Sequence, residues 1–126
     1  MAEALKVLVV DDNEALTMTL CLLLEILGHS ATPAHSGAQA IVCARREVPD
    51  VVLMDLTLPD QSGYDACQVL RRMPALADTR FIANSGRSDR NAIEQAYCAG
   101  FQDYLVKPVS IETLEHALAS VRPVAR

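Results

Sequence analysis

The stretch Val51-Val-Leu-Met-Asp55 decides the fold, because four apolar residues in a row lead directly to a carboxylate. A short apolar run of this kind is typical of a strand that is buried on both faces. Two further runs have a similar form: Leu5-Lys-Val-Leu-Val-Val10 precedes Asp11-Asp12, and Asp103-Tyr-Leu-Val106 precedes Lys107-Pro108. If the three runs are neighbouring parallel strands, three carboxylates and one ammonium meet at one edge of a sheet.

Around these runs, short apolar stretches alternate with longer amphipathic ones. The pattern predicts strands over 5–10, 30–33, 51–55, 80–84 and 103–106, and helices over 14–27, 37–46, 64–73, 90–99 and 111–121. Strands that alternate with helices form a parallel sheet covered on both faces. Right-handed crossovers then favour an α/β, flavodoxin-like (βα)5 fold with strand order 2-1-3-4-5. The 126 residues are expected to form a single domain over 1–126.

Composition and charge argue against several classes of protein. The net charge of −5 and the absence of a basic block give no sign of a nucleic-acid surface. The N-terminus lacks the pattern of a signal peptide, and the most apolar window, 16–27, is too short to cross a bilayer. We therefore expect a cytoplasmic protein that binds neither nucleic acid nor membranes. The four cysteines lack the spacing of a zinc site and are expected to be buried or half-buried thiols.

Five residues at the ends of strands are candidates for one site: Asp11, Asp12, Asp55, Ser85 and Lys107. Each has an ordinary explanation by itself, because carboxylates after strands often cap helices and surface lysines are usually solvated. Together they lie at the carboxyl ends of the strands, where ligands bind in such sheets. The carboxylates can hold Mg²⁺, and the lysine and the serine hydroxyl can contact phosphate oxygens. Asp55 can then act as a nucleophile toward a phosphoryl group.

With these residues in place, the chain resembles the receiver domains of two-component response regulators from Val7 to about Leu118. Receivers of hybrid histidine kinases and single-domain response regulators are the most similar. The expected protein is therefore a stand-alone receiver or the receiver part of a longer chain. The motifs that carry the resemblance are Asp11-Asp12, Asp55, Leu58-Pro59-Asp60 with Gly63, Ser85-Gly86, Tyr104 and Lys107-Pro108.

The resemblance implies a phosphoacceptor that takes a phosphoryl group from a histidine kinase or a histidine phosphotransfer protein. It would catalyse only its own phosphorylation and dephosphorylation. Phosphorylation would switch the face formed by the fourth helix, fifth strand and fifth helix. The implied phosphoacceptor is Asp55, Lys107 and Ser85 would contact the phosphoryl group, and Ser85 and Tyr104 would be switch residues. The implied ligands of Mg²⁺ are Asp11, Asp12, Asp55 and the backbone carbonyl of Thr57.

The segment Asn84-Ser85-Gly86 departs from the family pattern, because many members have an apolar residue, Thr and Ala there. Serine keeps the hydroxyl, so the switch is expected to work. Thr57 and Arg87 stand at positions that vary in the family and tune the lifetime of the phosphate, which leaves that rate open. Tyr104 could instead be a simple half-buried strand aromatic.

Two other functions on similar chemistry or the same fold stay open at this point. A phosphotransferase of the haloacid dehalogenase type also forms an aspartyl phosphate with Mg²⁺. It requires an acid two residues after the nucleophile, where this chain has Thr57, and a cap insertion for which 126 residues leave no room. A phosphate-independent interaction module is the other alternative, and the intact acidic pair, Asp55 and Lys107 argue against it.

The helix predicted over 14–27 carries more apolar residues than one buried face requires. Its core stripe is expected at Leu16, Leu20, Leu23, Leu24 and Leu27, and a second stripe contains Met18, Cys21, Leu22 and Ile26. The helix could be buried on two sides, but we favour an exposed apolar patch at Met18, Leu22 and Ile26. Receivers dock histidine-bearing helical partners beside this helix, so the patch is the predicted docking surface for the phosphodonor.

Overall fold

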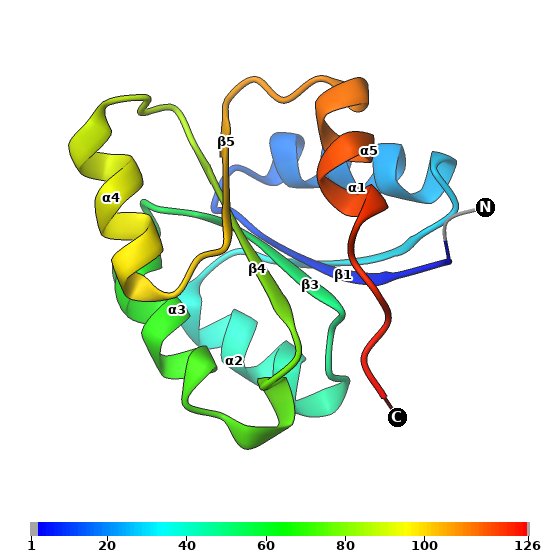
Figure 1. Cartoon of the computed structure of the whole chain (residues 1–126), viewed down its shortest axis with the longest axis horizontal. Coiled ribbons are helices and arrows are strands. Elements are labelled where there is room, and N and C mark those ends of the chain that lie inside the picture. The colour runs from blue at the N-terminus through cyan, green and yellow to red at the C-terminus, as the bar shows by residue number, and fades with distance from the viewer. Residues whose placement is uncertain (1–2, 126) are drawn as a thin grey trace.

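The computed structural model describes residues 3–125 and contains a five-stranded parallel sheet with helices on both faces (Figure 1). Its strand order is β2-β1-β3-β4-β5, so the flavodoxin-like topology predicted from the sequence is confirmed. The strands are β1 (Lys6–Val10), β2 (Ser30–Ala34), β3 (Val51–Asp55), β4 (Arg80–Ser85) and β5 (Asp103–Val106). The helices are α1 (Glu14–Ile26), α2 (Gly37–Arg46), α3 (Gly63–Arg71), α4 (Arg90–Ala99) and α5 (Ile111–Ala119), with a 3₁₀ turn at Pro74–Leu76.

Side-chain oxygens at the helix N-termini explain where the helices begin. Asn13 accepts a hydrogen bond from the Leu16 N–H at 3.0 Å, and so it caps α1. Ser62 accepts from the Asp65 N–H at 3.1 Å, so α3 begins at Gly63, one residue before the predicted start. The helix also ends at Arg71 rather than at residue 73, because the chain turns into the 3₁₀ turn that starts at Pro74.

Two hydrophobic clusters fill the space between the sheet and its helices. One lies between the sheet and α1 and α5, and the other lies under α2, α3 and α4, which Figure 1 shows on the opposite side of the sheet. Val51 and Leu53 of β3 join the first cluster, whereas Val52 and Met54 join the second. This alternation is why the strand has no polar residue before Asp55.

Helix α1 is buried on one side only, so the alternative of a helix buried on two sides is wrong. Thr17, Leu20 and Leu24 are its buried residues, and the other predicted core leucines are partly buried. The prediction missed Thr17, whose hydroxyl donates to the backbone carbonyls of Asn13 at 2.8 Å and Asp11 at 3.1 Å. The apolar patch, Met18, Leu22 and Ile26, is 66%, 55% and 74% exposed.

The cysteines form no disulfide within the described residues, and one of them departs from the prediction. Cys67 is buried, which raises the pKa of its thiol to about 12, and Cys21 and Cys43 are half-buried. Cys98 is exposed, because α4 buries Ala92, Ala96 and Ala99 and turns Cys98 to the other side. No helix within residues 3–125 has the length and apolar character needed to span a membrane.

Candidate metal and phosphoryl site

The carboxyl ends of β1 and β3 bring two aspartates together. Val10 of β1 lies beside Met54 of β3, so Asp11 and Asp55, the next residues along each chain, occupy neighbouring positions at the sheet edge. Asp11 is buried and its backbone N–H donates to the Ala34 carbonyl at 3.0 Å. The Asp11 position is thus held by strands on both sides, which fixes the base of the site.

Lys107 links the two carboxylates. Its Nζ lies 2.7 Å from Oδ2 of Asp11 and 3.2 Å from Oδ2 of Asp55. The remaining oxygens accept from the backbone: Asp11 Oδ1 from the Asn13 N–H at 2.9 Å, and Asp55 Oδ1 from the Thr57 N–H at 3.3 Å. One ammonium therefore balances part of the charge of two buried carboxylates.

Asp12 completes an acidic cluster with Asp11 and Asp55. Each of the three residues offers one carboxylate oxygen, and these oxygens lie within 4.8 Å of one another. Asp12 is exposed whereas the other two are buried, so a cation can approach from solvent. Three carboxylates near one ammonium leave an excess of negative charge, and oxygen ligands suit hard cations such as Mg²⁺ or Ca²⁺. The cluster therefore fits a divalent metal ion.

Burial and nearby charges shift the pKa values of Asp55 and Lys107, which contact each other in this site. Burial raises the pKa of the Asp55 carboxyl, and the negative charge of Asp11 adds to this. The Thr57 N–H and Lys107 oppose the rise without cancelling it. Burial acts to lower the pKa of Lys107, but its hydrogen bond to Asp11 and the charges of both carboxylates outweigh burial and raise it. Lys107 is thus a cation at neutral pH, and a second cation would favour the ionised form of Asp55.

Ser85 and Tyr104 both contact the backbone of Arg87, in the loop between β4 and α4. The buried Ser85 hydroxyl accepts from the Arg87 N–H at 3.1 Å, and the Tyr104 hydroxyl donates to the Arg87 carbonyl at 2.7 Å. The backbone carbonyl of Ser85 accepts from the Lys107 N–H at 2.8 Å. Ser85 therefore lies beside the chain that carries Lys107, and its contact with Arg87 connects it to Tyr104.

The loop after β3 is held by residues whose role the sequence did not reveal. Both carboxylate oxygens of Asp60 accept backbone hydrogen bonds from the N-terminus of α2, from Gly37 at 2.9 Å and from Ala38 at 3.0 Å. These hydrogen bonds, and chiefly the one from Gly37, lower the pKa of the Asp60 carboxyl. A Cβ at Gly63 would overlap the Asp55 carbonyl oxygen and lie 2.7 Å from Cα of Leu56, so only glycine fits there. Pro59-Asp60 is a dipeptide that occurs in many turns, so no local pattern of the sequence shows that Asp60 binds the N-terminus of α2.

Thr57 lies in this loop, with an exposed side chain and a backbone paired to Ser62 in an isolated bridge. The role of its carbonyl as a metal ligand stays a prediction. The side chains of the apolar patch of α1 are exposed, and the role of the patch as a docking surface stays a prediction.

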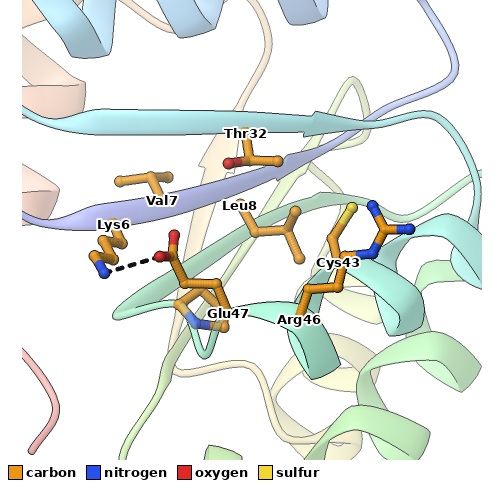
Figure 2. Close-up of a pocket in the computed structure, with 8 residues that line it drawn as sticks. Lys6, Val7, Leu8, Thr32, Cys43, Arg46 and Glu47 are labelled. Atoms are coloured by element: carbon orange, nitrogen blue, oxygen red, sulfur yellow. Dashed lines mark hydrogen bonds and ion pairs between the residues drawn. The ribbon is translucent and has the colours of Figure 1, made fainter. Parts of the chain in front are cut away.

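A separate pocket lies at the other end of β1, between the start of that strand and the end of α2 (Figure 2). Lys6 and Glu47 close one side of this pocket with an ion pair of 3.0 Å, and Cys43 and Arg46 line another part of it (Figure 2). It shares no residue with the acidic cluster. The chemistry of the carboxylates therefore belongs to the opposite end of the strand.

Comparisons with known proteins show to which family of domains the chain is similar. The sequence model of the response regulator receiver domain matches residues 7–119. The chain is 33% identical over 120 residues to the signal transduction histidine-protein kinase BarA of Escherichia coli, covering 95% of this chain and 13% of that protein. It is 42% identical over 107 residues to the probable transcriptional regulatory protein TcrX of Mycobacterium tuberculosis, covering 84% and 44%. The chain thus spans less than half the length of either relative.

A solved structure with a similar fold holds a magnesium ion. The receiver domain of the sensor histidine kinase PA1611 from Pseudomonas aeruginosa superposes with a TM-score of 0.84 at 30% identity. The match covers 92% of this chain and 95% of that one, and the structure of PA1611 has a magnesium ion coordinated in its active-site cleft.

Proposed function

Because the chain belongs to the response regulator receiver domain family, we propose that Asp55 accepts a phosphoryl group from a phosphohistidine protein in the presence of Mg²⁺. The observation that carries the proposal is the contact of Lys107 with both Asp11 and Asp55, with Asp12 within reach of the same point. This arrangement contains a nucleophile, a cation for the phosphoryl oxygens and an acidic cluster for a metal ion.

Each residue has a distinct part in the transfer. An oxygen of Asp55 attacks phosphorus, and the P–N bond of the phosphohistidine breaks as the O–P bond forms. Lys107 and the Ser85 hydroxyl bind two phosphoryl oxygens and orient the group in line with the attacking oxygen. Asp11, Asp12 and Asp55, together with the Thr57 carbonyl, would hold Mg²⁺, which neutralises charge on the phosphoryl group. The domain changes only its own state, through phosphorylation and dephosphorylation.

The partner class follows from the family and from α1. Histidine kinases and histidine phosphotransfer proteins present their histidine on a helix, and the apolar patch of α1 offers an exposed surface to such a helix. Such a partner also fits the cytoplasmic location expected from the sequence. The output is a change in the face formed by α4, β5 and α5, which the contact of Tyr104 with Arg87 joins to the site.

The alternative of a dehalogenase-type phosphotransferase finds no support, since the family match covers residues 7–119 and Thr57 occupies the place of the second acid. The acidic cluster and the contacts of Lys107 with Asp11 and Asp55 argue against a phosphate-independent interaction module. Intact-mass spectrometry with acetyl phosphate tests the proposal. One added phosphoryl mass with Mg²⁺, and none with EDTA, is the expected result.

A further inference from the structure

The side chain of Asn84 has a hydrogen-bonding group that the rest of the site leaves unused. Asn84 is 3% exposed, and within residues 3–125 its side-chain carbonyl oxygen, Oδ1, is buried without a hydrogen-bond partner. A buried carbonyl without a donor costs free energy, so an orphaned oxygen of this kind calls for an explanation.

Asn84 lies on the same face of the sheet as Asp55. In the strand register Asn84 of β4 is the partner of Asp55 on β3 and of Leu105 on β5. Ile82, two residues earlier, packs with Leu53 and Leu105 in the cluster under α1 and α5. Because side chains alternate along a strand, Asn84 faces the side on which Asp55 and its neighbours lie.

The side chain of Lys107 must pass over the end of β4. Lys107 follows β5, and its backbone N–H donates to Ser85 of β4. Its Nζ nevertheless contacts Asp55 of β3 and Asp11 after β1, and both strands lie beyond β4 in the sheet. The aliphatic stem of Lys107 therefore crosses β4 on the face to which Asn84 belongs.

We infer that Asn84 is a positioning residue for Lys107, and this inference rests on the proposed phosphoacceptor function. An ammonium has three N–H donors; Asp11 accepts one of them, and Asp55 forms an ion pair with the same nitrogen. A divalent cation on Asp11 and Asp12 competes for the same oxygens and repels the ammonium. Asn84 lies toward β5, away from that cation, so its Oδ1 accepts the released N–H and holds Lys107 at the phosphoryl group.

The chain offers a clean way to observe this contact, because Lys6 and Lys107 are its only lysines. ¹⁵N-lysine labelling therefore gives two ammonium signals. Lys6 is the internal control, since it pairs with Glu47 at the far end of β1 (Figure 2). The matched variants are Asn84→Val and Asn84→Thr, which have the same shape and differ in an acceptor hydroxyl.

The experiment compares wild type, Asn84→Val and Asn84→Thr, first with Mg²⁺ and then with added beryllofluoride as a phosphoryl mimic. In wild type and Asn84→Thr, Mg²⁺ and beryllofluoride should slow proton exchange of the Lys107 ammonium. In Asn84→Val, proton exchange of the Lys107 ammonium should stay about threefold or more faster than in wild type, while exchange of the Lys6 ammonium should be unchanged. Phosphorylation by acetyl phosphate should fall about tenfold or more in Asn84→Val, the effect of one hydrogen bond to a charged group.

Thermal unfolding separates this role from a structural one. Without metal, Asn84→Val should unfold at a higher temperature than wild type, because the unpaired carbonyl is gone. Equal Lys107 exchange and equal phosphorylation rates in all three proteins would overturn the inference, as would equal losses in Val and Thr. If wild type gains no phosphoryl group, the proposed function fails, whereas the Lys107 signals with Mg²⁺ alone still test the contact with Asn84.

Discussion

The ammonium of Lys107 contacts the carboxylate of Asp11 at 2.7 Å, although the two residues lie 96 positions apart in the chain. Asp11 is buried, so removal of the lysine would leave a carboxylate inside the protein with less compensation. The same ammonium reaches Asp55 at 3.2 Å. The structure therefore joins the acidic cluster to the phosphoacceptor through one side chain.

Metal binding should depend on Asp12. Asp12→Ala removes the one exposed carboxylate among the three that the described residues bring together here. The Mg²⁺ affinity should therefore fall about tenfold or more, and phosphorylation by acetyl phosphate should be lost. Titration of Mg²⁺, followed by amide chemical shifts, measures the affinity. Without metal the variant should unfold at the same or a higher temperature, because one like charge is gone. Wild-type affinity in Asp12→Ala would show that Asp12 is not a ligand.

Asp55 should destabilise the metal-free fold at neutral pH. Its pKa is raised in the folded protein, chiefly by burial, so protonation favours folding and this contribution is lost as the pH rises through the folded pKa. Asp55→Asn cannot ionise and keeps the Lys107–Asp11 pair, so in EDTA its unfolding midpoint should exceed that of wild type by a few degrees at pH 7.

The difference in unfolding midpoint between Asp55→Asn and wild type should shrink as the pH falls below the folded pKa of Asp55, because residue 55 is then neutral in both proteins. Thermal unfolding of both proteins in EDTA across this pH range measures the difference. The matched control is Asp78→Asn, which changes an exposed aspartate and should show no such trend. A wild type as stable as Asp55→Asn at pH 7 would contradict the electrostatic strain assigned to this site.

Ser85 should couple phosphorylation to α4. The Ser85 hydroxyl accepts a hydrogen bond from the Arg87 N–H, and the Tyr104 hydroxyl donates one to the Arg87 carbonyl. A phosphoryl group that draws the hydroxyl toward Asp55 releases the Arg87 N–H and shifts the loop before α4. Ser85→Ala should still bind beryllofluoride, but the amide shifts of residues 90–99 should change about half as much or less. A full response of those amides would exclude the serine from the switch.

Docking of the phosphodonor should depend on the apolar patch of α1. Leu22→Glu places a charge at a position that is 55% exposed, so the fold should be retained while a helical partner is repelled. Phosphotransfer from the cognate kinase should fall at least about tenfold, and labelling by acetyl phosphate should match wild type. Val42→Glu, at an exposed position on α2, is the control and should transfer normally. Normal transfer to Leu22→Glu would place the partner elsewhere.

The strands and the edge at which they meet were predictable, because four apolar residues precede the aspartate at the end of β3 and four precede Asp11 in β1. Five alternating units then left few topologies, and the order of the strands brought Asp11 beside Asp55. The contacts of Asp60 with α2 and the unpaired oxygen of Asn84 were not predictable. The contacts of Asp60 join it to residues 22 and 23 positions earlier in the chain, and the place of Asn84 depends on the strands on either side of β4. No local periodicity encodes either relationship.

The most direct test of the central claim is the site of phosphorylation itself. Wild type and Asp55→Asn are incubated with Mg²⁺ and acetyl phosphate and compared by intact-mass spectrometry, and peptide mapping then locates the modified residue. We expect one phosphoryl mass on wild type, located at Asp55, and none on Asp55→Asn, because an amide oxygen is a poor nucleophile. Equal labelling of the two proteins, or a phosphoryl group at another residue of wild type, would contradict the account.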